Sequence, residues 1–223
     1  MRKQYKSKRK SKKTAKYISG VFLLLLFVIG AFVAMKFFEI GLFSDRYVER
    51  EGNEMKIEQP EMSVQLLTIN PYSRPGSRSE RIENIVIHYT ANPGTSAVQN
   101  RNYFEGLKDS HKTKASSHFI VGIRGEIVQC VPTWEIAYAS NERNINTVSI
   151  ETCHLKSDGA YTKETYDSMV HLTAWLCEKF GLTEKDIIRH YDITGKNCPK
   201  YFVEEEEAWL RFKEDVRKML EAR

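Results

Sequence analysis

The chain has 223 residues, enough for one globular domain with appended segments, and its hydrophobic content of 41% is that of an ordinary globular protein. The net charge of +5 is unevenly distributed, because residues 1–16 carry nine of the 34 basic side chains and no acidic one. The rest of the chain holds the other 25 basic and all 29 acidic side chains, a net charge of −4. A mildly acidic domain lacks the basic face that phosphate backbones require, which argues against nucleic acid as its partner.

An uncharged stretch of 19 residues, 17–35, follows the basic tract and is rich in Leu, Val, Phe and Ile. As a helix rising about 1.5 Å per residue, it matches the ~30 Å hydrocarbon core of a bilayer. The stretch is longer than the apolar core of most signal peptides, and no Ala-x-Ala cleavage site follows it. We therefore favour a transmembrane anchor over 17–38, rather than a cleaved signal or a buried core helix. The positive-inside rule then makes residues 1–16 a cytoplasmic tail and places the chain after residue 40 outside.

Residues 39–61 are polar and charged, and we interpret them as a stalk before a domain over residues 62–223. Apolar runs with β-branched residues favour strands, and periodic apolar stripes favour helices. Strands are expected over 64–69, 84–89, 116–123, 126–131 and 147–153, with a short strand or extended segment over 134–139. Helices are expected over 97–107, over 162–180 and from Glu204 to the end. The helix over 162–180 is the clearest, since Thr162 suits an N-cap and Gly181 a C-terminal stop.

The cysteines are widely spaced and include no Cys-x-x-Cys pair, so they form neither a disulfide framework nor a zinc finger. They are Cys130, Cys153, Cys177 and Cys198. Cys198 is distinguished by its position eight residues after His190, a spacing too long for one helix face but suited to a loop that folds back on a metal. His88, at the end of a predicted buried strand, is a candidate for the third ligand. Two imidazoles and a thiolate bind one Zn²⁺ tetrahedrally and leave the fourth position open, as in catalytic sites.

Each of these ligands has a plainer interpretation when it is taken alone. A single histidine such as His88 is more often a hydrogen-bonded core residue, and a single cysteine such as Cys198 is more often a small buried hydrophobe. Glu151 interrupts an apolar strand, where a carboxylate is unfavourable unless it is paired or functional. It is therefore a candidate general base for a water activated at the metal, with a salt bridge to an Arg as the alternative. Lys196 is a candidate for stabilising an oxyanion, or else an ordinary surface lysine.

Four segments of the sequence carry a resemblance to a known family: residues 85–90, 116–121, 149–151 and 190–199. In this order they resemble the zinc-dependent N-acetylmuramoyl-L-alanine amidases, which include phage lysozyme-amidases and peptidoglycan recognition proteins. The resemblance implies an α/β fold, with a mixed central β-sheet flanked by helices, preceded here by one N-terminal transmembrane helix. It also implies roles for particular residues. These are zinc binding by His88, His190 and Cys198, stabilisation of the intermediate by Lys196, and base catalysis by Glu151.

Two positions depart from the family pattern. Some members carry a catalytic Tyr at the position of Ser117. Members also often have a His at the position of Ala139. The base role then falls to Glu151, and altered substrate contacts are expected near Ala139. His118 is retained, and we predict that it binds substrate or supports the site from behind, with Ser117 and Asn92 as further substrate contacts.

The resemblance implies hydrolysis of the amide between N-acetylmuramic acid and L-alanine in peptidoglycan. The expected topology agrees independently, because an external domain on a membrane stalk would face the cell wall, and we expect this domain to be monomeric. One alternative is a non-catalytic peptidoglycan-binding receptor, although superfamily members of that kind lack the cysteine ligand that Cys198 supplies. Another is a different zinc amidase or peptidase that uses the same site. Asp192, within the 190–199 segment, is expected either to orient His190 or to cap the turn.

Overall fold

The structure is a computed structural model, and it describes residues 55–222. The predicted basic tail, the transmembrane anchor over 17–38 and the stalk up to residue 54 lie outside the described residues. Within the described part of the chain, no helix has both the length and the apolar character needed to cross a bilayer.

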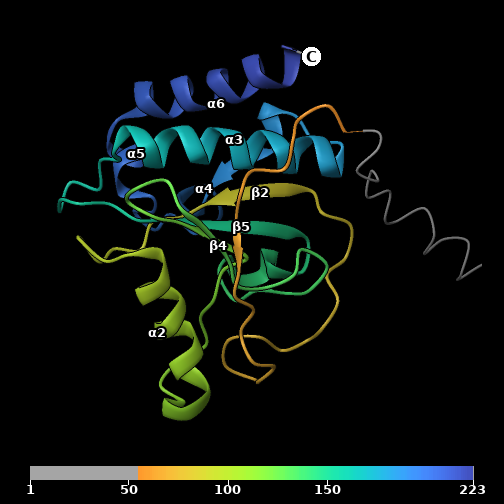
Figure 1. Ribbon diagram of the computed structural model, residues 1–223, viewed down its shortest axis with the longest axis vertical. Helices are drawn as coiled ribbons and strands as arrows, with labels where there is room; N and C mark the ends of the chain where they lie inside the picture. Colours follow the sequence, from red (N-terminus) through yellow and green to blue (C-terminus); the bar gives the residue numbers. More distant parts are fainter. Residues whose placement is uncertain (1–54, 223) are drawn as a thin grey trace, which may run out of the picture. The chain divides into compact units, whose positions relative to one another are not determined.

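A six-stranded mixed sheet forms the centre of the domain, with strand order β1-β4-β3-β5-β2-β6 (Figure 1). Neighbouring strands are parallel except β3 and β4, which form an antiparallel hairpin. The strands are β1 (Ser63–Val64), β2 (Asn84–Ile87), β3 (Phe119–Val121), β4 (Ile127–Gln129), β5 (Thr147–Thr152) and β6 (Ile187–Arg189). The predicted mixed sheet is therefore confirmed, although most strands are shorter than expected.

Helices cover both faces of this sheet (Figure 1). Helices α3 (Lys163–Phe180) and α6 (Glu206–Glu221) are stacked on one face, and α2 (Ala97–Ser110) lies on the other. Each face has its own apolar core, because successive strand residues point to opposite sides. Phe119 belongs to the larger core under α3 and α6, whereas its neighbour Ile120 belongs to the smaller core under α2.

Capping interactions determine where the long helices begin and end. Thr162 caps α3 through the backbone N–H of Thr165, and Gly181 closes it in the left-handed conformation with φ 66°, as predicted. Helix α2 begins with a capping box at Ser96 but continues to Ser110, one turn past the predicted end. The C-terminal helix α6 begins at Glu206, because the short α5 (Lys200–Glu204) precedes it. Its predicted inward face is buried at Trp209, Phe212, Val216 and Leu220 and partly buried at Met219.

The edge strand β1 is shorter than the predicted 64–69 strand, yet the chain after it stays attached to β4. The N–H groups of Gln65 and Leu67 donate to the carbonyls of Gln129 and Cys130, each at 2.9 Å. The Arg101 guanidinium of α2 binds the carbonyls of Gln65 and Leu66, at 3.0 Å each. A side chain from α2 thus covers groups that would otherwise form an open sheet edge.

The last part of the predicted stalk packs onto the domain. Ile57 is buried in the larger core. Its N–H donates to the Glu178 carboxylate of α3 at 2.7 Å, and the N–H of Lys56 donates to the same group. These bonds fix the path of the chain where it enters the domain.

Candidate metal centre and active site

The two histidines are brought together by the register of two parallel strands. Ile87, the last residue of β2, is paired with Arg189, the last residue of β6. His88 and His190 come next on each strand, so their rings meet with centroids 4.7 Å apart. This is the carboxyl edge of parallel strands, where α/β sheets commonly bind ligands.

Cys198 reaches the histidines through a helix and a turn rather than through the open loop expected from the sequence. His190 begins the one-turn helix α4 (His190–Thr194), which ends at Gly195 with φ 75°. The chain then folds back, and the N–H of Tyr191 donates to the carbonyl of Cys198 at 2.8 Å. The Cys198 Sγ atom lies 3.9 Å from Nδ1 of His88. One donor atom from each of the three residues lies within 4.8 Å of the others.

Both imidazoles are held from behind by two consecutive residues. Nε2 of His88 lies 3.3 Å from Oγ of Ser140, and Nε2 of His190 lies 3.3 Å from Oδ1 of Asn141. An amide oxygen only accepts, so the hydrogen bond assigns the proton of His190 to Nε2. Its Nδ1 then carries a lone pair, and among residues 55–222 this buried atom has no hydrogen-bond partner. This nitrogen is therefore available to bind a metal ion.

The electrostatics of this cluster set the protonation states of its three donors. Burial, followed by the charges of His190 and Lys196, holds the pKa of His88 well below its usual value, and burial and Lys196 lower the pKa of His190. Both imidazoles are therefore neutral and able to ligate. Burial, with help from the Glu151 charge, raises the pKa of Cys198 to about 12, so the sulfur stays a thiol until a cation stabilises the thiolate.

The spacing of these donors also fits zinc. Bonds of about 2.0–2.3 Å in a tetrahedral site place donor atoms ~3.3–3.8 Å apart. The 3.9 Å between the sulfur and the His88 nitrogen is close to this spacing, and the full set, within 4.8 Å, needs only a small contraction. The donor set and its geometry therefore fit Zn²⁺.

Glu151 lies on β5 beside this cluster. Its Oε2 atom is buried and has no hydrogen-bond partner among the described residues, and no ion pair to an Arg is formed there. Burial raises its pKa to about 7, and the positive charge of Lys196 opposes that rise. A carboxyl group with this pKa can both take and return a proton near neutral pH.

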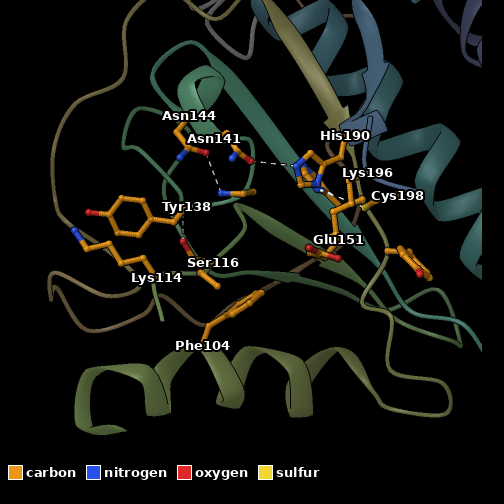
Figure 2. A pocket seen from close by; sticks show the side chains of 14 residues that line it. Phe104, Lys114, Ser116, Tyr138, Asn141, Asn144, Glu151, His190, Lys196 and Cys198 are labelled. Atoms are coloured by element: carbon orange, nitrogen blue, oxygen red, sulfur yellow. Dashed lines mark hydrogen bonds between the residues drawn. The ribbon is translucent and has the colours of Figure 1, made fainter. Parts of the chain in front are cut away.

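A cavity of 440 Å³ joins these groups to an outer arm. The predicted site residues that line it are His88, Glu151, His190, Lys196 and Cys198. Figure 2 shows Glu151, His190, Lys196 and Cys198 gathered at one end of the cavity, with Lys114 and Tyr138 at the other. Lys196 lines the cavity and is also exposed to solvent. The structure thus brings together all five residues predicted for metal binding and catalysis.

The three residues predicted to bind substrate do not line this cavity. His118 is buried, with Nδ1 3.0 Å from Ser149 Oγ and Nε2 2.9 Å from the carbonyl of Glu135. The Ser117 hydroxyl is also buried, and it bonds to Phe119 and Ser149 within the sheet. Asn92 is exposed on the loop before α2. The two roles expected for His118, substrate binding and support of the site, stay predictions, as does substrate contact by Ser117 and Asn92.

Other residues line the outer arm that the sequence analysis did not single out. They include Lys114, Ser116 and Asn144, together with Phe104 and Tyr138. Phe104 lies on α2 and has the spacing of a core residue. Tyr138 lies in the 134–139 segment, which has no regular strand and forms an isolated β-bridge between Arg78 and Glu135. Neither pattern distinguishes a groove residue from a packing residue.

Asp192 caps the turn and does not contact His190 through any hydrogen bond seen in residues 55–222. Its carboxylate accepts from the N–H of Arg189 at 2.8 Å and from the Arg189 guanidinium at 2.9 Å. The same guanidinium binds the carbonyl of Phe202 and the carboxylate of Glu206. Arg189 therefore ties α4, α5 and α6 together directly behind the ligand His190. The capping alternative for Asp192 is confirmed.

All four cysteines are free and buried, which leaves Cys198 available as a ligand. The fold and the site together define an α/β protein with a His-His-Cys metal-type centre at a sheet edge, next to an unpaired carboxylate. Residues 78–201, more than half of the chain, match the family described as N-acetylmuramoyl-L-alanine amidase (Amidase_2). The chain belongs to this family.

Similarity to individual proteins agrees with that assignment. The chain is 36% identical over 165 residues to the N-acetylmuramoyl-L-alanine amidase CwlL of Bacillus licheniformis, which covers 68% of the chain. It spans 45% of the length of that relative, so it matches less than half of it. The catalytic domain of XlyA has the same fold, with a TM-score of 0.60 at 23% identity, covering 70% of this chain and 99% of that one. PlyL is similar, with a TM-score of 0.61 at 22% identity over 71% and 98% of the two chains.

Proposed function

We propose that this protein is a zinc-dependent N-acetylmuramoyl-L-alanine amidase, which hydrolyses the amide between N-acetylmuramic acid and L-alanine in peptidoglycan. One observation carries the proposal. His88, His190 and Cys198 converge within 4.8 Å beside the unpartnered carboxylate of Glu151, at the end of a 440 Å³ cavity. Membership of the amidase family supports the substrate.

The roles of the residues follow from their positions. A Zn²⁺ ion held by His88, His190 and Cys198 would polarise the scissile carbonyl and make water a stronger acid. Glu151 takes the proton from the attacking water and later donates it to the leaving amine of L-alanine, which its pKa near neutrality permits. Lys196 places positive charge where the carbonyl oxygen becomes negative. The buried surroundings of Glu151 strengthen these charge interactions, because the local dielectric constant is low.

The location of the enzyme is a further part of the proposal. We infer a single-pass membrane protein with residues 1–16 in the cytoplasm, an anchor over 17–38 and a monomeric amidase domain facing the wall. The basic tract and the 19 uncharged residues after it support this arrangement. Protease treatment of intact protoplasts tests it. The domain is expected to be digested from outside, and its protection would contradict this orientation.

The activity is tested with purified cell wall and the full-length protein. The expected result is the release of peptides with new L-alanine amino termini, by a protein that contains one equivalent of zinc. Cys198→Ser is expected to lose both zinc and activity. Glu151→Gln is expected to keep zinc and lose activity by roughly 10²–10⁴-fold.

The same experiment separates the enzyme from a non-catalytic receptor. If the zinc-loaded wild type binds wall tightly but releases no amino termini, the protein is a receptor and the amidase proposal fails. If Glu151→Gln keeps nearly full activity, its assignment as the base is wrong.

A further inference from the structure

The outer arm of the cavity is lined by different kinds of side chain from those at the metal end. Figure 2 shows Lys114, Ser116, Tyr138 and Asn144 grouped away from the metal-binding residues. We call the three polar groups Lys114, Ser116 and Asn144 the donor arm. Each of them presents hydrogen-bond donors to the cavity.

The Lys114 ammonium group is unpaired but held in place. It lies 5.5 Å from the centroid of the Tyr138 ring, a cation–π distance. Among residues 55–222, no carboxylate forms an ion pair with it. The backbone that carries the ring is itself fixed, because the Tyr138 N–H donates to Ser116 Oγ at 2.9 Å and the Tyr138 carbonyl accepts from the Ser116 N–H at 3.0 Å. The cation is therefore positioned at the cavity without a partner of its own.

Ser116 and Asn144 have their acceptor atoms occupied by the protein. The Ser116 Oγ atom accepts from the N–H of Tyr138 at 2.9 Å, and within the described residues its own hydroxyl hydrogen has no acceptor. Oδ1 of Asn144 accepts from the N–H groups of Ala139 and Ser140, at 2.9 and 2.5 Å. These bonds fix the orientation of the amide and leave its NH₂ group as the part that is free to bind a ligand.

The charge balance of the cavity decides what this arm can bind. Among the residues that line the cavity, Glu151 is the only acidic one, and it lies at the metal end. The donor arm therefore offers one cation and several N–H and O–H donors, without an acidic group. A ligand with a negative charge and acceptor oxygens satisfies all of them, whereas a neutral amide leaves the cation without a counter-ion.

We propose that the donor arm binds a carboxylate on the peptide portion of the substrate, so that the enzyme prefers peptides with free carboxyl groups over amidated ones. This inference rests on the proposed amidase function. In that reaction the lactyl carboxyl of the sugar is already part of the scissile amide, so the remaining carboxylates of the substrate belong to its peptide. Lys114 is the specificity-determining residue, and it acts on binding rather than on the chemical step.

The test compares one muramoyl-peptide in two forms, with its carboxyl groups free and with the same groups amidated. Affinity is measured by calorimetry in the zinc-loaded Glu151→Gln background, and kcat and KM are measured with Glu151 intact. The free-carboxyl peptide is expected to bind roughly 3–10-fold more tightly. Lys114→Met is expected to remove that preference through KM, with kcat little changed, and Lys114→Arg is expected to restore it.

Lys112 provides the matched control, since it is an exposed lysine two residues away that does not line the cavity. Lys112→Met is expected to keep the wild-type preference. If Lys114→Met keeps the preference, or weakens the binding of both peptides equally, the donor arm does not select carboxylates. If the wild-type enzyme cleaves both peptides, the amidase proposal stands whether or not the donor arm selects carboxylates. If it cleaves neither peptide and the Glu151→Gln protein binds neither, the amidase proposal and this inference both fail.

Discussion

Oδ1 of Asn141 lies 3.3 Å from Nε2 of His190, and the preceding residue, Ser140, stands at the same distance from Nε2 of His88. Two consecutive residues thus orient two ligands that are far apart in the sequence. Hydrogen bonds of this kind hold the ring and its tautomer, and metal affinity usually depends on them. The strand that follows, β5, supplies Glu151, so one chain segment connects the orientation of the ligands with the position of the base.

Removing the Asn141 amide is expected to weaken zinc binding by about 10-fold. Asn141 has φ 52°, a left-handed conformation that Asn and Gly accept more easily than other residues. Asn141→Gly therefore removes the side chain without adding backbone strain. The measurement is the zinc dissociation constant from competition with a chelator of known affinity.

Asn141→Asp is the control, because it keeps an acceptor oxygen near Nε2 of His190. It is expected to bind zinc at least as tightly as the wild type. Equal zinc affinities for the Gly variant and the wild type would show that Asn141 does not orient His190.

Glu151 is expected to reduce the stability of the metal-free protein at neutral and alkaline pH. Its folded-state pKa of about 7 lies above the value of 4.5 expected in the unfolded chain. Between these values the unfolded carboxyl loses its proton and the folded one keeps it, so stability falls as the pH rises from 4.5 to about 7 and then stays constant. The loss is on the order of 3 kcal/mol. At pH 8, Glu151→Gln is therefore expected to be more stable than the wild type by about this amount.

Urea denaturation of both metal-free proteins at pH 4.5 and pH 8 measures this effect. The difference in the free energy of unfolding between them isolates position 151, because other titrating groups are common to both. A difference that is the same at both pH values would mean that the Glu151 carboxylate is not desolvated in the folded state. A large gain at pH 8 alone would mark a residue retained for activity at the expense of stability.

The sequence predicted the metal end of the site better than the outer arm. His88, His190 and Cys198 have side chains whose chemistry is rare in combination, and strand register then fixes their meeting point. Glu151 was found because a carboxylate in an apolar strand is energetically unusual. The signal of Glu151 belongs to a single residue and that of the ligands to a combination of residue types, and neither requires knowledge of the tertiary structure.

The outer arm depends on packing that a sequence does not encode locally. Ser117 and His118 seemed exposed to substrate, but the sheet directs both side chains into bonds with Ser149. Tyr138 reaches the cavity from a segment without a strand, where no periodicity shows which way a side chain points. Helix ends such as Thr162 and Gly181 were predictable, because capping is local chemistry.

Arg189→Met is expected to destabilise the domain by roughly 2–3 kcal/mol. The guanidinium is largely buried and binds Asp192, Glu206 and the carbonyl of Phe202, so its loss removes two charge-assisted bonds and leaves the buried Phe202 carbonyl without this donor. Arg217→Met is the matched control. Arg217 also binds two carboxylates, but on the exposed side of α6, and its loss is expected to change stability much less than the loss of Arg189. Urea denaturation gives both values, and equal effects would contradict the structural role of Arg189.

Lys196→Met is expected to lower kcat by roughly 10²-fold while the zinc content stays at the wild-type value, because Lys196 is outside the ligand set. Its charge also lowers the pKa of Glu151, and activity requires the Glu151 carboxylate, so activity is lost as pH falls through that pKa. Without Lys196 the pKa rises, and the acidic limb of the kcat/KM profile moves to higher pH. Lys200→Met, four residues away and bonded to the carbonyl of Ser157, is expected to leave the limb in place. A lower kcat with an unmoved limb would assign Lys196 to the oxyanion alone, and an unchanged kcat would exclude it from the chemistry.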